Sequence, residues 1–381
     1  MKLPHLLVGV LLTSVLASCQ AESTASAKVE TPEPVVHGRQ HGAASRVMVV
    51  VNQNSPESKQ IGAYYKAARG IPERNMLSIS CPAEEEVTME GFERDILGPI
   101  KRALAGRTPR IDYIVTTRGV PIRVSNRNGL SVDALIAAHE LPFEPIGEPP
   151  QQEMLVRARN PFFNSSEKFD GARMKMRLVT RLDGYTLEDV KGLIDRSIAA
   201  KPAKGVFFFD MAGNRQEGGY GQHNQLLSEA HRVLTGRGFE SRLDSGPEFV
   251  LPSEPLMGYA GWGSNDGAFS LEKYRAIKFL PGSIAETYVS TSGRTFRPTS
   301  GGQSLIADLV RQGVTGVKGY VSEPYLFAMA VPPLLFDRYV SGWNLAESYY
   351  CASPVLKWKD VIIGDPLCAP YASAATQQTE Q

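Results

Sequence analysis

The sequence predicts an α/β fold in which helices flank a mainly parallel sheet. Apolar runs of strand length alternate along the chain with segments that have the apolar spacing of helices. Strands that alternate with helices pair in parallel, because each helix returns the chain to the same edge of the sheet. Hydrophobic residues make up 42% of the 381 positions, enough for a large core.

The alternation begins at residue 46 and continues almost to the end of the chain. The expected strands lie at 46–52, 76–81, 111–116, 176–180 and 205–210, near 241, 256 and 283, and at 316–321 and 361–363. The expected helices lie at 56–69, 89–104, 187–199, 224–236 and 303–312, and a further apolar segment covers 334–350. Thr186 and Asp189 have the spacing of a capping box, which places the start of one helix.

The folded body is expected to span residues 46–371, with one irregular insertion at about 126–173. Prolines at positions 142, 145, 149, 150 and 161 and the lack of a clear period mark this insertion. Residues 372–381 are small and polar, and we expect a disordered tail there.

The amino terminus has the pattern of an export signal. Lys2 precedes an apolar run at 6–16 that is too short to span a bilayer as a permanent helix. The run closes with small residues before Cys19, which resembles the lipobox cut by the lipoprotein signal peptidase. We expect a signal peptide over residues 1–18, although cleavage elsewhere would leave Cys19 incidental.

The resemblance implies an exported envelope protein held at a membrane by lipid on Cys19. Several acyl chains anchor a protein stably where one does not. Gln20 resembles the sorting signal for the outer membrane, facing the periplasm. Residues 19–45, rich in Ala, Ser, Thr, Glu and Pro, are expected to form a flexible tether.

Charge and cysteine content limit the partners. The chain has 41 Lys and Arg against 40 Asp and Glu, so it lacks the basic excess of a nucleic-acid-binding protein. It has no paired-cysteine or zinc-protease motif, and neither a metal nor an organic cofactor is expected. Signal cleavage leaves Cys81, Cys351 and Cys368, and an oxidising compartment allows a disulfide, with Cys351–Cys368 the nearer pair in sequence.

Two segments resemble each other, 113–119 and 177–184. Each is an apolar run that ends in Thr and Arg before a glycine-containing turn. Open parallel sheets bind ligands at the carboxyl ends of their strands, and arginine binds carboxylate or phosphate as a fork. Arg118 and Arg181 are therefore candidate anion-binding residues. The alternative is a structural role, in which these arginines and their neighbours pair with nearby acids: Arg118, Arg123 and Arg181 with acids such as Asp112 and Asp183.

Two later apolar runs end in distinctive turns. The first closes with Gly-Tyr-Ala-Gly-Trp-Gly-Ser-Asn at 258–265, and the next with Tyr-Val-Ser-Thr-Ser-Gly at 288–293. These strand ends resemble the gingipain-type, caspase-like cysteine peptidases, and the resemblance covers about 256–371. In that family the first turn carries a catalytic histidine and the second a nucleophilic cysteine. Trp262 and Ser290 stand in their places, so cysteine peptidase activity is not expected.

One hypothesis is a catalytically degenerate domain that binds a peptide, a protein tail or a glycan. Tyr259 and Trp262 would form a stacking platform, and Arg118 and Arg181 would bind an anion. Packing in the core is the alternative for Trp262. The glycines on either side of Trp262 favour a site, because they let a ligand or backbone come close.

The alternative is a hydrolase or transferase. Ser290 or Ser292 would be the nucleophile, Asp266 or His223 the base, and backbone amides near Gly293 would hold the oxyanion. A purely structural envelope protein with an assembly partner is the third possibility.

Over the whole body the chain resembles one uncharacterised family of exported bacterial proteins. The resemblance includes residues 45–124 with their Thr-Thr-Arg-Gly-Val-Pro-Ile-Arg run. That family occurs in genomes that encode exosortase. It implies a role near protein sorting or exopolysaccharide matrix assembly.

Overall fold

The computed structural model describes residues 42–125, 129–142, 153 and 156–372. The expected signal peptide, Cys19, the tether as far as residue 41 and the tail from residue 373 lie outside the described residues. In the part of the chain that is described, no helix combines the length and the apolar character needed to cross a membrane.

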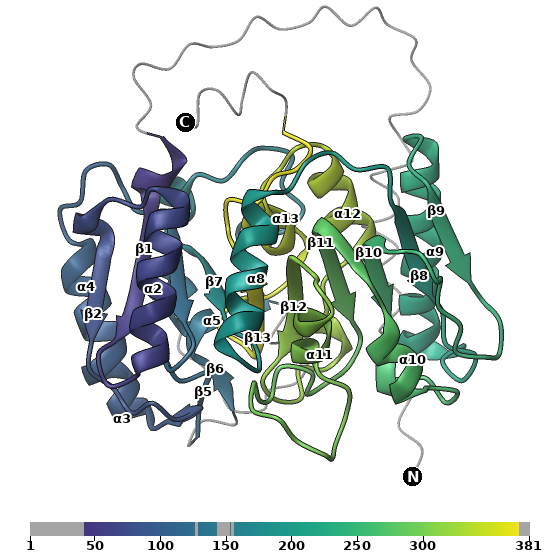
Figure 1. Cartoon of the computed structure of the whole chain (residues 1–381), viewed down its shortest axis with the longest axis horizontal. Helices are drawn as coiled ribbons and strands as arrows, with labels where there is room; N and C mark the ends of the chain where they lie inside the picture. Colours follow the sequence, from purple (N-terminus) through teal and green to yellow (C-terminus); the bar gives the residue numbers. More distant parts are fainter. Residues whose placement is uncertain (1–41, 126–128, 143–152, 154–155, 373–381) are drawn as a thin grey trace, which may run out of the picture. The chain divides into compact units, whose positions relative to one another are not determined.

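A ten-stranded sheet lies at the centre of the described body (Figure 1). Its strands are ordered β2-β1-β4-β7-β13-β12-β11-β10-β8-β9. Their bounds are β1 Val47–Asn52, β2 Met76–Ile79, β4 Tyr113–Thr117, β7 Leu178–Leu182, β8 Val206–Asp210, β9 Ser241–Asp244, β10 Leu256–Gly261, β11 Phe279–Thr287, β12 Gly316–Tyr320 and β13 Asp360–Gly364. Neighbours are parallel within β2-β1-β4-β7 and within β12-β11-β10-β8-β9. β13 is antiparallel to β12 and meets β7 at a single bridge.

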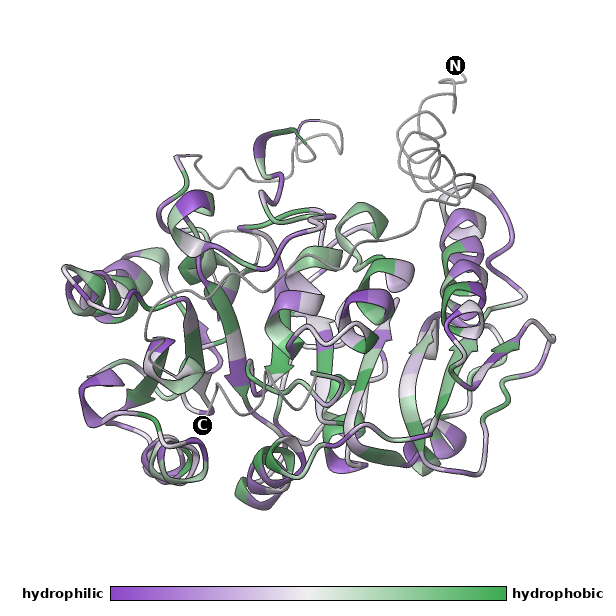
Figure 2. Ribbon diagram, turned by 90° about the horizontal axis from the view of Figure 1, so that it is seen from above, coloured by the Kyte–Doolittle hydropathy of each residue, from purple (hydrophilic) through white to green (hydrophobic). Residues whose placement is uncertain are grey.

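Helices cover both faces of the sheet (Figure 2). α2, α8 and α11 pack beside one another on one face, and α9, α12 and α13 on the other. The helices are α2 Pro56–Arg69, α3 Met89–Gly91, α4 Gly98–Leu104, α5 Val132–Ala137, α7 Gly171–Met174, α8 Leu187–Ile198, α9 Gly218–Gly236, α10 Leu271–Ala276, α11 Ile306–Arg311, α12 Pro332–Val340 and α13 Leu345–Ala352. β1, β4, β7, β8, β10, β12 and β13 are buried along their whole length, as strands covered on both faces must be. The predicted α/β class with a mainly parallel sheet is confirmed.

The carboxyl ends of β4 and β11 lie at the same edge of the sheet, although β4 is early in the chain and β11 late. Arg118, directly after β4, donates to the carbonyl of Phe296 in the loop after β11, at 3.2 Å. Arg123 donates to the carbonyl of Arg294 in the same loop. We call this edge, at the bottom of Figure 1, the carboxyl edge. A small sheet joins it, made of β3 Glu86–Val87, β5 Arg123–Val124 and β6 Leu130–Ser131.

Several local predictions can be compared with the structure. The capping box at Thr186 and Asp189 is present at the start of α8. Residues 130–137, within the segment expected to be irregular, form β6 and α5, and α5 packs on β7. The segment 334–350 is two helices, and the chain turns between them at Gly342, whose φ is +83°.

A buried ion pair attaches α5 to the sheet. Arg181 on β7 has no exposed surface, and its Nε and Nη2 donate to the two carboxylate oxygens of Asp133 on α5, at 2.9 and 2.7 Å. Its remaining donors bond the carbonyls of Val120 and Pro121. Such a pair is costly to break, because one partner's charge remains in the interior.

We therefore predict that Asp133→Asn lowers the free energy of unfolding by about 3 kcal/mol. Urea denaturation measures the loss. Glu229→Gln is the matched control, because Glu229 pairs with Arg232 on the surface of α9, and such pairs contribute less than about 1 kcal/mol. Equal effects of the two substitutions would contradict the assignment.

Candidate functional site

The two turns that resemble a catalytic pair lie side by side. β10 and β11 are parallel neighbours, and Gly261 pairs with Thr287 at their carboxyl ends. The Asn265 amide donates to the carbonyl of Tyr288 at 2.6 Å, which ties the first turn to the second. The two turns therefore lie next to each other at the carboxyl edge.

Tyr259 and Trp262 do not form a stacking platform. Their exposures are 0% and 1%, so a ligand cannot reach either ring. Trp262 donates from Nε1 to Asn224 on α9 at 2.6 Å, and its ring packs against Tyr288 with centroids 4.9 Å apart. The prediction is wrong because both side chains belong to the core.

The flanking glycines make room for the protein's own side chains. A Cβ at Gly261 would lie 2.7 Å from the hydroxyl of Tyr259 and 2.9 Å from Cβ of Asp210. A Cβ at Gly263, which has a φ of +49°, would lie 2.8 Å from the hydroxyl of Ser304. Close approach was correctly expected, but the approaching groups come from the chain itself.

The two candidate nucleophiles differ in access. Ser290 is half-buried, and its hydroxyl bonds no imidazole or carboxylate among the residues described. Ser292 is fully buried, and its hydroxyl has no hydrogen-bond partner in the described part of the chain. The proposal of Ser292 as a nucleophile is therefore wrong, because a substrate cannot reach it.

His223 is held away from any catalytic role. Its Nδ1 lies 2.9 Å from the carbonyl of Gly219, and its Nε2 lies 3.1 Å from the carbonyl of Leu326. Burial lowers its pKa, and the two backbone carbonyls act in the opposite direction. A general base needs a nitrogen lone pair directed at the nucleophile, and both nitrogens of His223 face backbone. His223 lies near the start of α9, which begins at Gly218, before the helix expected at 224–236.

Asp266 is occupied by its own loop. One carboxylate oxygen accepts the backbone N–H of Ala268 at 2.8 Å, and the side chain is 7% exposed. It also lies close enough to Asp210 to raise the pKa of that carboxyl. No hydrogen bond links Asp266 to Ser290 among the described residues.

The two arginines have structural partners. Arg181 is fully buried with Asp133, so the prediction that it binds a ligand is wrong. Arg118 bonds Glu57 at 2.8 Å and Asp183 at 3.3 Å, and a third donation goes to the carbonyl of Gly184 at 2.6 Å. The alternative, in which these side chains fasten loops, fits this geometry.

The structure adds a buried acid that the sequence did not single out. Asp210 ends β8 and is 1% exposed, and in the described part of the chain the hydroxyl of Tyr259 is the one side-chain donor that acts on its carboxylate. Burial, with smaller contributions from Asp266 and Asp244, raises its pKa to about 8. The sequence contains a sign of this buried acid, since Asp210 directly follows three phenylalanines at the end of an apolar run.

Two tyrosines at the carboxyl edge are exposed. Tyr220 is 45% exposed and Tyr325 is 43% exposed, and we call them the tyrosine pair. Each adjoins a residue whose carbonyl faces His223: Gly219 before Tyr220, and Leu326 after Tyr325. His223 therefore fastens together the two segments that carry the pair.

Each member of the pair has an ordered neighbour. Arg215 lies over the Tyr220 ring, 4.7 Å from its centroid. Phe327 stacks on Tyr325 with centroids 6.1 Å apart and an interplanar angle of 17°. Tyr325 has φ +60° and ψ 158°, a conformation that is costly for a residue with a side chain. The surrounding contacts hold this ring outward.

The predicted disulfide is absent. Cys351 and Cys368 are both free and buried. The carbonyl of Cys368 bonds Leu345 in the first turn of α13, whereas Cys351 lies in its last turn. Six residues of helix separate these positions by about 9 Å, beyond the reach of a disulfide. Among the described residues, no group of three or more His, Cys, Asp or Glu side chains is arranged to hold a metal ion.

Similarity to known proteins is found in structure and not in sequence. No protein-family model matches the sequence, and no curated protein matches it. A solved chain described as "Structure of Protease" is similar with a TM-score of 0.47 and 11% identity, covering 88% of this chain and 81% of that chain. At this level, similarity is no basis for assigning an activity.

The raised pKa of Asp210 predicts a pH dependence of stability. The unfolded chain releases this proton near pH 4, and the folded protein holds it up to about pH 8, so stability falls as pH rises through that window. The side chain of the Asp210→Asn variant cannot ionise, so this fall in stability does not occur in the variant. Its free energy of unfolding, relative to the wild type, should increase between pH 5 and pH 8 in urea denaturation. Glu188→Gln, at an exposed position, is the control. A difference that is constant with pH would sink the assignment.

Proposed function

We propose that this protein is a non-catalytic binding protein of the cell envelope that holds a peptide, a protein tail or a glycan at the carboxyl edge of its sheet. The observation that carries the proposal is the state of His223, whose ring nitrogens both face backbone carbonyls. A serine hydroxyl needs a base to become a nucleophile at neutral pH. Neither His223 nor Asp266 is placed to supply one to Ser290.

We infer a caspase-like scaffold in which the catalytic dyad is replaced. Support comes from the adjacency of β10 and β11, whose turns carry Trp262 and Ser290. Trp262 fills the place of a catalytic histidine with a side chain that donates to Asn224 and packs in the core. Indole cannot accept a proton from a nucleophile. This arrangement favours a binding role over the hydrolase or transferase alternative.

The tyrosine pair is the surface that we assign to the ligand. Tyrosine combines an apolar ring with a polar hydroxyl, and such side chains are enriched where proteins bind partners. Both rings are held by ordered neighbours, so little conformational freedom is lost on binding. The ligand would lie against the first turn of α9 and the loop after β12.

Binding to arrays of synthetic peptides and oligosaccharides tests this assignment with the purified full chain. Wild type and Ser290→Ala should bind the same members with dissociation constants within about twofold. The double variant Tyr220→Ala, Tyr325→Ala should lose at least about tenfold in affinity, because it removes two aromatic contacts. Val250→Ala is the control, since Val250 is similarly exposed, at 47%, in the loop before β10.

Two outcomes would contradict the binding role. One is turnover of an array member by the wild type that disappears in Ser290→Ala. The other is unchanged affinity in the double variant, which would move the ligand away from the tyrosine pair.

We also propose that the folded body is attached to a membrane by lipid on Cys19, and that it acts in protein sorting or matrix assembly. The lipobox-like sequence before Cys19 and the resemblance to exported proteins of exosortase-encoding genomes support this proposal. Envelope proteins or glycans would then be its natural partners.

Metabolic labelling with an alkyne fatty acid in a Gram-negative host tests the anchor. Wild type and Cys81→Ala should carry the label and remain in the membrane fraction. Cys19→Ala should carry none, because the acceptor sulfur is gone. Equal labelling of Cys19→Ala and wild type would refute lipid attachment at this residue.

A further inference from the structure

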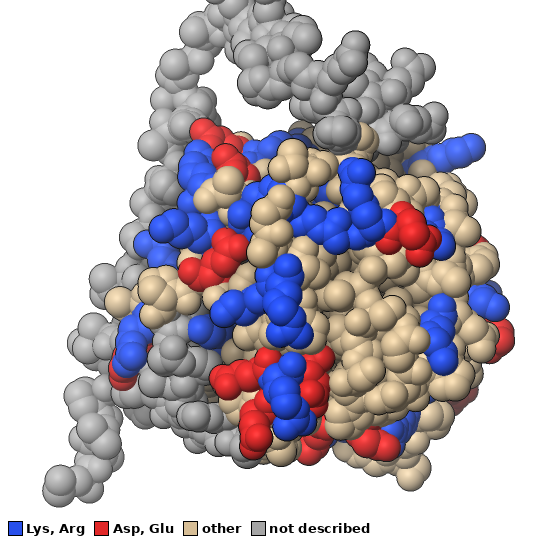
Figure 3. Space-filling view, turned by 90° about the vertical axis from the view of Figure 1, so that its left-hand side faces the viewer, with Lys and Arg blue, Asp and Glu red and all other residues tan. Residues whose placement is uncertain are grey.

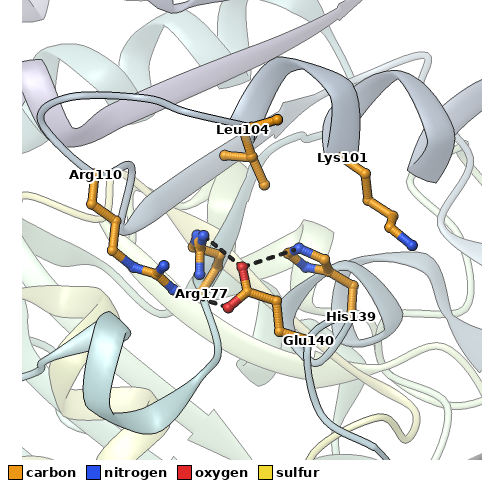
Figure 4. Close-up of a pocket in the computed structure, with 7 residues that line it drawn as sticks. Lys101, Leu104, Arg110, His139, Glu140 and Arg177 are labelled. Carbon is orange, nitrogen blue, oxygen red and sulfur yellow. Dashed lines mark hydrogen bonds and ion pairs between the residues drawn. The ribbon is translucent and has the colours of Figure 1, made fainter.

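A hollow lies at the edge of the sheet opposite to the tyrosine pair, where β4 and β7 begin. It has a volume of about 450 Å³, within the range of small-molecule sites. The end of α4, the loop before β4, the segment directly after α5 and the residue before β7 form its walls. The side chains that line it are Lys101, Leu104, Arg110, His139, Glu140 and Arg177 (Figure 4).

One carboxylate serves two guanidinium groups in this pocket. Glu140 accepts from Arg177 at 2.8 Å and from Arg110 at 3.2 Å. In Figure 4 it lies between the guanidinium groups and the imidazole of His139. Glu140 is the only carboxylate that lines the pocket, as the described residues define it.

The cations exceed the available negative charge. Arg177 is 3% exposed, and its Nε has no hydrogen-bond partner in the described part of the chain. Lys101 is exposed on α4 and forms no ion pair with any described residue. Three cations and one carboxylate therefore line the pocket; a second carboxylate, that of Asp112, lies 3.6 Å from Nε of Arg110 but does not line the pocket and also pairs with Arg46. Figure 3 shows further Lys and Arg side chains gathered on the upper half of the face that carries α4.

His139 does not correct this imbalance. Its Nδ1 lies 2.7 Å from the carbonyl of Ile136, and its Nε2 lies 3.6 Å from Glu140. Burial lowers its pKa, Glu140 opposes this effect, and Lys101 and Arg110 lower the pKa further. An anion bound in the pocket would raise the pKa of His139, because a nearby negative charge stabilises the protonated imidazole.

We propose that this pocket binds a small molecule through an acidic oxyanion group, a phosphate or a carboxylate, held between Lys101 and the paired guanidiniums of Arg110 and Arg177. Arginine forks bind these groups with paired hydrogen bonds, and Leu104 offers an apolar wall to the rest of the ligand. The site is separate from the tyrosine pair and does not depend on it. Nothing in the proposal requires a covalent step.

The test is a titration of the full chain, with histidine labelled for NMR, at constant ionic strength. Inorganic phosphate and acetate are the two probes, and chloride is the reference. The His139 signal, assigned with a His139→Gln variant, should shift saturably with phosphate, acetate or both. The pKa of His139 should rise at saturation. The stronger probe identifies the oxyanion class.

Three variants make the result specific. Lys101→Gln should weaken binding by about threefold, as expected for one partly exposed charge. Arg102→Gln should leave it unchanged, since Arg102 is exposed on the same helix but does not line the pocket. Glu140→Gln should tighten binding by a similar factor, because it removes the competing negative charge.

The proposal fails if neither probe gives a saturable shift of His139. It also fails if Lys101→Gln and Arg102→Gln weaken binding equally, which would indicate screening by general surface charge. Weaker binding in Glu140→Gln would mean that the carboxylate recognises a cation or only maintains the fold. Circular dichroism and urea denaturation distinguish loss of fold from loss of binding.

Discussion

Burial of the central sheet on both faces is the constraint on which the rest of the structure depends. Helices cover the strands, and seven of the ten are buried along their whole length. The polar side chains of these seven strands that approach solvent or a ligand are therefore expected near the strand ends. Each feature that we assign lies at one of these two edges: the tyrosine pair at the carboxyl ends, and the basic pocket where β4 and β7 begin.

The same constraint explains the turn after β10. Trp262 and Tyr259 were interpreted as surface groups, because glycines flank the tryptophan. In the structure those glycines admit Asp210, Tyr259 and Ser304, so that the turn closes on itself. His223 completes the closure by bridging the first turn of α9 and the loop after β12. His223 was a candidate base, and its contacts instead position the segments that carry Tyr220 and Tyr325.

Local patterns in the sequence were sufficient to predict part of this architecture. Apolar alternation predicted the α/β class, and the spacing of Thr186 and Asp189 predicted the start of α8. The burial of Arg181 could not be predicted, because its partner Asp133 is 48 residues away in a segment without a clear apolar period. The tyrosine pair was missed for the same reason, since the contact that fixes Tyr325 joins residues 103 positions apart. Local spacing carries no information about such pairings.

The central claim is that Ser290 is not an activated nucleophile, and its reactivity tests this claim most directly. A fluorophosphonate probe modifies serine hydroxyls that a neighbouring base activates. Intact-mass and peptide mass spectrometry of the treated full chain should show no adduct at Ser290, under conditions that label a control serine hydrolase completely. A stoichiometric adduct mapped to Ser290 would contradict the account and make the protein an enzyme.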